Sequence, residues 1–341
     1  MPFGGNDWLA QTQEPIIEPD LPICDPHHHF WDFRTERLPY QRYLLHELSA
    51  DIGSGHNVRS TVFIEARAMY RADASEALRP VGEVEFVQGL AAASASGLYG
   101  PARAAAAIIG HANLNLGEHV EPVLEAIQLA SPNRFRGIRH TVTWDPNPHV
   151  ENTAAHKIPH QLTSDQFIQG ARVLARMGLS YDCWQYFHQL PELAALARAI
   201  PDLSIIVNHI GGMVRNGPYA GRDDEILPAW RSSIAELAAC PNVSIKLGGL
   251  GMPRTGFDWH TRTIPVGSEE LASSIAPFFH YCIEQFSPER CMFESNFPVD
   301  KVSYSYHVLY NAFKRLSREY SPSERAAMFH DTAVRIYRVA A

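Results

Sequence analysis

The first stretch of the chain that could carry out chemistry is the run Asp25–Trp31, with the sequence DPHHHFW. Two of its histidines, His27 and His29, stand two positions apart, and alternate residues of a strand point to the same side. These two imidazoles would therefore project together, while His28 would face the other way. Paired imidazoles on one face can hold a divalent cation, although a His-x-His pair also occurs often by chance.

Two later runs set polar residues directly after short apolar segments. The run Val207–Gly212 (VNHIGG) contains His209, followed closely by two glycines that would let a ligand approach the backbone. The run Met292–Lys301 (MFESNFPVDK) contains Asn296. A polar residue at the tip of a buried strand needs a partner or a ligand. His209 is therefore a site residue or a histidine bonded to a neighbouring loop, and Asn296 is a site residue or the cap of a turn.

The segments that would position these residues alternate between strand-like and helix-like patterns. Eight short apolar runs predict strands buried on both faces: Leu21–Asp25, Val58–Ala66, Ala105–His111, Phe135–Thr141, Leu179–Tyr186, Leu203–His209, Val243–Leu247 and Arg290–Ser295. Segments with helical periodicity or capping signals are Glu118–Ala130, Ser164–Met177, Pro191–Ala199, Ala229–Ala239, Glu269–Gln285, Tyr304–Glu319 and Ser323–Val339. Repeated strand–helix alternation predicts an α/β fold, a single-domain (β/α)8 TIM barrel. A doubly wound sheet is the alternative, but no GxGxxG run follows the first strand.

Three long connections follow predicted strands, namely Trp144–Thr163, Gly211–Pro228 and Gly248–Pro265. They leave the carboxyl ends of the fourth, sixth and seventh strands, which is the face where barrel active sites are built. Residues 1–20 show little periodicity and are expected to form an arm or a poorly ordered lead-in. Residues 21–341 are expected to form the barrel.

Composition restricts the classes of partner. Of the 341 residues, 45% are apolar and 19% are charged, which excludes disorder as the main state. The formal net charge of −8 argues against nucleic acids and against an anionic membrane surface, so the expected partner is a small molecule. A homodimer is left open. Five scattered cysteines, and an N-terminus without a basic and then apolar leader, favour a reducing cytoplasm.

The order and content of these motifs resemble the amidohydrolase superfamily. Within it they are similar to the amidohydrolase-2 type branch that contains pyrone-dicarboxylate lactonases and sugar-acid lactonases. The resemblance rests on the DxHxHxW start, the NHIGG element, the run Gln189–Leu193, the SNFPVD run and the C-terminal segment Glu324–Tyr337. It spans Ile23 to Tyr337. It implies a barrel hydrolase in which water opens a small lactone of a carboxylic acid.

The resemblance also implies roles for the histidines. His27 and His29 occupy the first-strand metal-ligand positions, and His209 occupies the sixth-strand position that contacts metal, substrate carbonyl or attacking water. Asn296 stands where the family usually has an aspartate that ligates metal and acts as general base. An amide cannot take up a proton near neutral pH, and it is a weaker, neutral ligand. The resemblance therefore implies one divalent ion, Zn or Mn, with metal-free function as the alternative.

Without that aspartate, another group must act as general base. His209 is the first candidate, because an imidazole can be poised near the operating pH. Asp300, four residues beyond Asn296, is the second. His140 and Glu65 are further candidates, and Glu65, at the tip of the second strand, has an ion pair to a nearby arginine as its alternative role.

A substrate carboxylate would be held by arginine, whose planar fork binds it in a bidentate way. Arg139 is preferred over Arg136, because it lies nearer the carboxyl end of the fourth strand. His140 stands beside it, and Lys246 on the seventh strand would face the barrel mouth or pair with Glu65. An apolar wall for a ring-shaped substrate could come from Trp31, Trp144 and Tyr186, which are otherwise ordinary packing residues.

Two other functions are compatible with these residues. A related branch of the superfamily decarboxylates or hydrates aromatic-derived acids with one metal, and release of carbon dioxide would distinguish it. Alternatively, Asn296 could mark a barrel that binds a ligand without catalysis.

Overall fold

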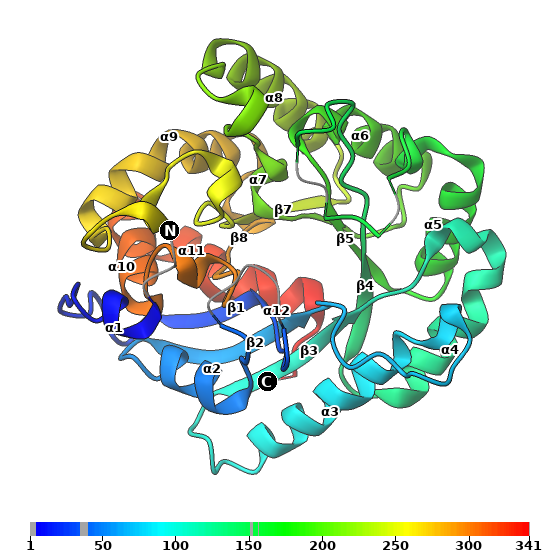
Figure 1. Cartoon of the computed structure of the whole chain (residues 1–341), viewed down its shortest axis with the longest axis horizontal. Coiled ribbons are helices and arrows are strands. Elements are labelled where there is room, and N and C mark those ends of the chain that lie inside the picture. Colours follow the sequence, from blue (N-terminus) through cyan, green and yellow to red (C-terminus); the bar gives the residue numbers. More distant parts are fainter. Residues whose placement is uncertain (1–4, 35–39, 151–152, 156, 341) are drawn as a thin grey trace.

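Eight parallel strands form one sheet that curves into a nearly closed barrel (Figure 1). The computed structural model describes residues 5–34, 40–150, 153–155 and 157–340. The strands pair in sequence order and are β1 Pro22–His28, β2 Asn57–Ile64, β3 Arg103–Gly110, β4 Phe135–Thr141, β5 Ser180–Trp184, β6 Ile205–Val207, β7 Val243–Leu247 and β8 Cys291–Phe293. A parallel bridge between His28 and Phe297 joins β1 to the segment after β8. The (β/α)8 prediction is confirmed, and the sequential strand order excludes the doubly wound alternative.

The strands are apolar on both faces because both faces are buried. On β2, Val62 and Ile64 belong to a small core inside the barrel, whereas Phe63 belongs to the larger core under the helices. On β3, Ile109 and Ile108 divide in the same way. This division follows from the two-residue period of a strand.

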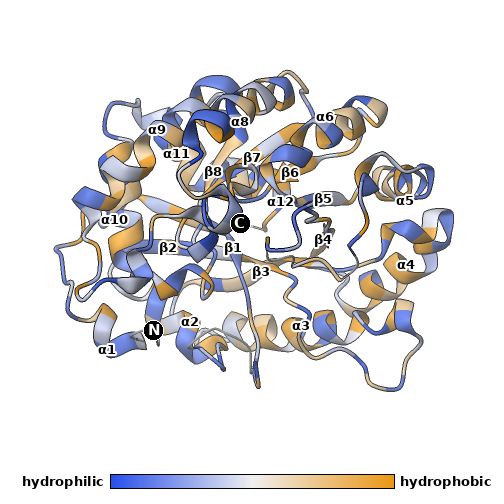
Figure 2. Cartoon of the chain, turned by 45° about the horizontal axis from the view of Figure 1, so that its top comes forward, coloured by the Kyte–Doolittle hydropathy of each residue, from blue (hydrophilic) through white to orange (hydrophobic). Residues whose placement is uncertain are grey.

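Helices cover the outside of the strands, and hydrophobic and hydrophilic positions alternate along them (Figure 2). They are α1 Gly5–Leu9, α2 Leu45–Ile52, α3 Val81–Ala95, α4 Glu121–Ala130, α5 Asp165–Arg176, α6 Leu190–Ala199, α7 His209–Gly212, α8 Asp223–Ala238, α9 Ser268–Phe286, α10 Tyr306–Leu316, α11 Pro322–Ala326 and α12 Thr332–Tyr337. Local signals explain some of their ends. The Ser164 side chain accepts from the Phe167 N–H at the start of α5, and Pro191 lies in the first turn of α6.

The helices differ from the sequence prediction in three places. α2 and α3 were not predicted, and the apolar residues of α3 are spread around the helix instead of forming one stripe. α8 begins before the predicted start at Ala229 and contains Pro228, which sequence reasoning treats as a boundary. The predicted final helix is divided by a π-helical turn at Ala327–Asp331.

Residues 5–20 pack against the barrel. α1 buries Trp8, whose indole N–H donates to the carbonyls of Arg262 and Thr263 at 3.1 Å each. The Thr12 hydroxyl donates to the Pro265 carbonyl at 2.9 Å. The described part of the arm is therefore held against the loop after β7, which differs from the expectation of a poorly ordered lead-in. The division between an arm and a barrel domain stays a prediction.

The cysteines are packing residues. Cys24, Cys183, Cys240, Cys282 and Cys291 are all free thiols and all buried. Burial raises the pKa of the Cys183 thiol, so it stays protonated. In the described residues, every helix is too short or too polar to cross a membrane.

The C-terminal helix α12 closes the amino-terminal end of the barrel. Tyr337 is fully buried against the inward-facing strand residues, and its hydroxyl donates to Asp182 Oδ1 at 2.9 Å. Just beyond it, Arg338 donates to the carbonyl of Gly178, directly before β5, at 2.7 Å. The barrel interior is thus sealed at this end, and the opposite end is the one open to polar ligands.

Replacing Tyr337 tests this seal. Tyr337→Ala would open a cavity under the strands and should lower the free energy of unfolding by about 3–5 kcal/mol, the usual cost of truncating a buried aromatic residue. Urea unfolding followed by circular dichroism measures the loss. Leu129→Ala, at a side chain that is 82% exposed, is the control and should change stability by less than about 0.5 kcal/mol. Equal, small losses for both variants would contradict the seal.

Candidate functional site

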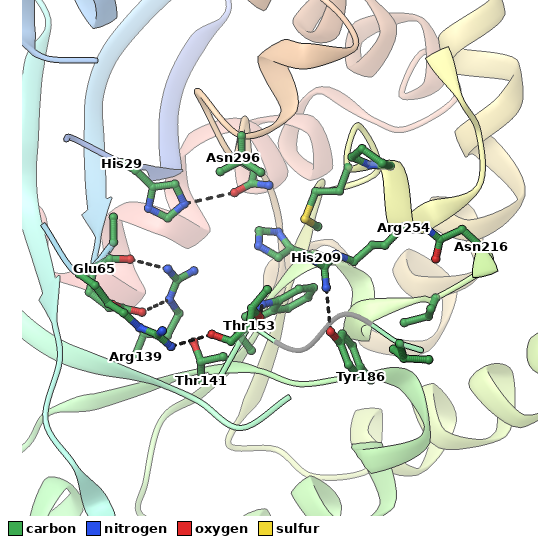
Figure 3. Close-up of a pocket in the computed structure, with 18 of the residues that line it drawn as sticks. His29, Glu65, Arg139, Thr141, Thr153, Tyr186, His209, Asn216, Arg254 and Asn296 are labelled. Atoms are coloured by element: carbon green, nitrogen blue, oxygen red, sulfur yellow. Dashed lines mark hydrogen bonds and ion pairs between the residues drawn. The ribbon is translucent and has the colours of Figure 1, made fainter. Parts of the chain in front are cut away.

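A cavity of about 560 Å³ opens at the carboxyl ends of the strands (Figure 3). Strand tips supply its polar floor, with His29, Glu65, Arg139, His209 and Asn296. All three long connections predicted from the sequence supply its walls, through His149, Val150, Thr153, Val214, Asn216, Gly217, Met252, Pro253 and Arg254 among others. The cavity therefore lies where barrel active sites are built.

The three predicted imidazoles converge at this floor. The ring centroid of His27 lies 4.9 Å from that of His29 and 4.6 Å from that of His209. His29 and His209 line the cavity, whereas His27 is fully buried beneath it. His28 faces the other way, as predicted, and its Nε2 lies 2.8 Å from the hydroxyl of Thr61.

One carboxylate, which sequence reasoning missed, joins two of these imidazoles. Glu294 directly follows β8, and its two oxygens lie 2.6 Å from His27 Nδ1 and 2.7 Å from His209 Nδ1. The backbone N–H of His209 also donates to Glu294, at 3.1 Å. Burial lowers the pKa of both histidines well below its usual value, so each ring holds a single proton. His209 donates its Nδ1 proton to Glu294 Oε1, so its Nε2 is an acceptor. Among the described residues Glu294 Oε2 has no hydrogen-bond partner, and its contact with His27 Nδ1 is an ion-pair distance.

The ammonium of Lys246 lies under this cluster and compensates its charge. Its Nζ is 3.4 Å from His27 Nδ1 and 2.6 Å from Asp182 Oδ1. Burial raises the pKa of Glu294, and Lys246 opposes that shift. Lys246 and Asp182 are both fully buried. The expectation that Lys246 faces the mouth or pairs with Glu65 is therefore wrong, because its partner is an inward-facing carboxylate of β5.

Two glycines make room for this cluster. A Cβ added to Gly248 would overlap the side chain of Glu294, and one added to Gly249 would overlap the ring of His209. Gly249 also has φ +73°, a left-handed conformation that favours glycine. The Gly-Gly pair after β7 is thus a packing requirement of the cluster.

Arg139 is the cation at the cavity floor. Its Nε donates to Glu65 Oε1 at 2.8 Å, Nη2 donates to the Glu65 carbonyl, and Nη1 donates to His27 Nε2 at 3.3 Å. Burial alone would raise the pKa of Glu65, but Arg139 brings it below its usual value. Glu65 is therefore an ionised partner of Arg139. Arg136 lies at the other end of β4, where its guanidinium donates to the Arg338 carbonyl.

His29 and Asn296 form a pair of facing acceptors. His29 Nδ1 lies 2.8 Å from the Ile64 carbonyl, which can only accept, and burial lowers the pKa of the ring, so its one proton is on Nδ1. The Asn296 amide donates through Nδ2 to Asp300 Oδ1 at 2.7 Å. His29 Nε2 and Asn296 Oδ1, 3.3 Å apart, therefore both offer lone pairs.

This pair fits a divalent cation. A tetrahedral ion with bonds of about 2.0–2.1 Å needs donor atoms roughly 3.3 Å apart, which is the separation of His29 Nε2 and Asn296 Oδ1. His27, His209 and Glu294 also offer ligand atoms within 4.8 Å of one another. Their Nδ1–carboxylate separations of 2.6–2.7 Å are too short for two ligands of one tetrahedral ion.

The remaining predicted residues divide between the cavity and its surroundings. Trp31 and Tyr186 line the cavity, whereas Trp144 packs against His160 outside its lining. His140 lines a neighbouring cavity and accepts from the Leu114 N–H. Asp300 is buried below Asn296, where it also accepts from the Gly251 N–H and the Tyr304 hydroxyl. It positions Asn296 and does not line the cavity.

Arg254 is a second cation of the cavity that sequence reasoning missed. Its Nη1 donates to the Tyr186 hydroxyl at 2.8 Å, and its guanidinium lies over the Trp184 ring, 5.7 Å from the centroid. It comes from the loop after β7, where no periodicity or spacing marks it. Glu294 did carry a signal, since it is a carboxylate at the tip of an apolar strand, as Glu65 is.

Comparison with known proteins agrees with this architecture. A family model described as amidohydrolase matches residues 24–339. The uncharacterized protein y4mH of Sinorhizobium fredii is 32% identical over 338 residues, which cover 94% of this chain and 99% of that protein. L-fucono-1,5-lactonase of Burkholderia multivorans is 26% identical over 326 residues, covering 92% and 95%.

A solved structure shows the same fold. An amidohydrolase of Burkholderia multivorans, crystallised with bound Zn, superposes with a TM-score of 0.71 over 93% of this chain and 99% of that one, at 24% identity. The family model covers nearly the whole chain and includes the segments that supply the converging histidines, Glu294 and Asn296. The chain therefore belongs to the amidohydrolase family and is a hydrolase.

Proposed function

We propose that the chain is a lactonase that opens the cyclic ester of a sugar-derived carboxylic acid by adding water to its carbonyl. The observation that carries this proposal is the convergence of an acceptor, His209 Nε2, and a cation, Arg139, on one cavity. The similarity to a protein named L-fucono-1,5-lactonase, over 92% of this chain, supports the substrate class. Four arginines line the cavity, Arg34, Arg67, Arg139 and Arg254, and suit an acidic product.

In this mechanism His209 is the general base. Its Nδ1 proton is held by Glu294, so Nε2 can take a proton from water as the water oxygen bonds to the lactone carbonyl carbon. The ring C–O bond then breaks, and the imidazolium of His209 returns the proton to the leaving oxygen. Glu294 fixes the orientation of the ring through the Nδ1 hydrogen bond and, when ionised, stabilises the imidazolium, as the third member of a catalytic triad does.

The cations at the floor and wall would stabilise the charge that develops. The Arg139 guanidinium is fixed by Glu65 at 2.8 Å, so no reorganisation is needed when negative charge forms on the carbonyl oxygen. Arg254, held by Tyr186, lies on another wall and would orient the hydroxyl or carboxylate groups of the substrate. Trp31 and Trp184 supply apolar surface for the ring.

His29 and Asn296 would hold one divalent ion, Zn or Mn, which when bound would polarise the substrate carbonyl. This set contains no carboxylate, so binding would be weak. The neutral amide of Asn296 cannot accept the proton from water, so the base remains His209.

Replacing the base and its orienting carboxylate tests the mechanism. His209→Asn should lower kcat by about 10²–10⁴-fold, the usual contribution of a general base. Glu294→Gln should lower kcat with little change in KM, because an uncharged amide is a weaker acceptor for the Nδ1 proton of His209 and no longer stabilises the imidazolium. A pH-indicator assay over a panel of aldonolactones measures both effects. His119→Ala, at an exposed histidine outside the cavity lining, is the control. Full turnover by His209→Asn would exclude the proposed base, and carbon dioxide release in place of acid production would favour a decarboxylase.

The glycine pair offers a test by displacement. Gly249→Ala should push His209 from its position and lower kcat at least about 10²-fold, since small misplacements cost that much. Gly97→Ala is the matched control, because Gly97 has φ +82° but an added Cβ would meet nothing within 4 Å. Both variants carry the strain of a left-handed alanine, roughly 1–2 kcal/mol. Only Gly249→Ala should lose activity at a temperature where both are folded, and equal activities would contradict the packing argument.

Metal binding can be tested without an activity assay. Equilibrium dialysis against Zn²⁺ or Mn²⁺, followed by elemental analysis, should show weak binding of one ion. His29→Ala and Asn296→Ala should abolish it, and Asn296→Asp should tighten it by about tenfold or more, because a carboxylate is the stronger ligand. Unchanged binding in all three variants would assign the ion to other residues.

A further inference from the structure

A second cavity, of about 340 Å³, lies beside the first and has three lining residues in common with it, Glu65, Arg67 and Thr141. It is formed by the segment between β2 and α3 and by the carboxyl ends of β3 and β4. Its size is within the range of pockets that hold small ligands. The proposed reaction uses nothing beyond the shared wall.

The shared wall carries a buried charge with half of its hydrogen-bonding capacity unused. Glu65 is 2% exposed, and its Oε1 accepts from Arg139, but among the described residues Oε2 has no hydrogen-bond partner. Glu65 is ionised, because Arg139 lowers its pKa. A buried carboxylate oxygen without a donor costs several kcal/mol, so this oxygen calls for a donor supplied by a ligand or by water.

A second unpartnered group faces the same cavity. The hydroxyl oxygen of Tyr70 is buried and, within the described part of the chain, has no hydrogen-bond partner. His111, also in the lining, donates through Nδ1 to the Arg139 carbonyl at 3.0 Å, which leaves its Nε2 as an acceptor. Arg79 and Asn113 add donors to the lining.

The wall is rigid. The backbone N–H groups of Ala66 and Ala68 both donate to Glu83 Oε1 at 2.8 Å, and Glu83 is fully buried. Between them Arg67 has φ +57° and donates to the Thr153 carbonyl at 2.7 Å. Arg67 is therefore kept in a strained backbone conformation by the hydrogen bonds of the residues before and after it. This part of the cavity wall is formed before any ligand binds.

These groups select one class of ligand. An anion could pair with Arg67 or Arg79, but it would bring no proton to donate to Glu65 Oε2. An apolar group would leave both Glu65 Oε2 and the Tyr70 hydroxyl without partners. A group with several hydroxyls can donate to Glu65 and His111 and accept from Arg79 and Asn113. We propose that the second cavity is a subsite for a hydroxyl-rich substituent, so that the preferred substrates are lactones of disaccharide acids that reach past Glu65. This inference rests on the proposed lactonase function.

Paired substrates test the subsite. Initial rates are compared for glucono-1,5-lactone and for the 1,5-lactones of cellobionic, maltobionic and lactobionic acids. At least one disaccharide lactone should have a kcat/KM tenfold or more above that of glucono-1,5-lactone. Ala77→Trp would fill the second cavity and should remove this advantage while leaving the rate on glucono-1,5-lactone within twofold. Tyr70→Phe should reduce the advantage by roughly threefold to tenfold, the effect of one hydrogen bond.

The controls separate the two proposals. Ala95→Trp, at an exposed position on α3, should behave like the natural chain. Hydrolysis of glucono-1,5-lactone without any preference for the larger lactones, and without an effect of Ala77→Trp, would refute the subsite alone. If neither kind of lactone is hydrolysed, the proposed function is wrong. Calorimetric titration with the three disaccharide acids and with gluconate then decides the subsite. Binding of at least one disaccharide acid that Ala77→Trp removes supports the subsite, and its absence refutes it.

Discussion

The site depends on one buried carboxylate, Glu294, whose negative charge needs neighbouring hydrogen-bond donors and cations. Glu294 accepts from His209 Nδ1 at 2.7 Å and lies 2.6 Å from His27 Nδ1, and so ties the tips of β1 and β6 to the end of β8. A carboxylate this deeply buried is tolerated only when paired. The closed barrel brings the three strand ends together, the ammonium of Lys246 compensates the charge from below, and the glycines after β7 leave space for the side chains of Glu294 and His209. The orientation of both imidazoles is a consequence of this pairing.

Charge in the floor is arranged in pairs around this carboxylate. Lys246 with Asp182 lies beneath it, and Arg139 with Glu65 lies beside it, where Arg139 also donates to His27 Nε2. His27 therefore helps to position Arg139. The resemblance to the amidohydrolase superfamily implied instead that His27 is a metal ligand. His29 and Asn296, on the opposite side of the floor, are left as the acceptors that fit a cation. In the proposed mechanism, His209 is therefore the base and His29 contributes to the cation site.

Strand periodicity and topology make part of the site predictable from the sequence. Eight apolar runs imply a barrel, and the carboxyl ends of parallel strands meet at one mouth, so the convergence of His27, His29 and His209 could be predicted. The partner of Lys246 could not, because inward-facing contacts depend on the register between β5 and β7. Arg254 lies in a loop, and loops have no period. α3 was missed because a helix with apolar residues on all sides has no stripe.

The two oxygens of Glu65 connect the chemistry of the floor to the choice of substrate. Oε1 fixes Arg139, which the proposed reaction needs, and that contact keeps the carboxylate ionised. Ionisation in turn makes the unused Oε2 a strong acceptor in a buried wall between two cavities. In the proposed reaction, the same charge would fix the guanidinium near the substrate carbonyl and favour a substrate hydroxyl next to it. Selection for a larger, hydroxylated lactone would then arise from a residue whose first role is to hold the cation.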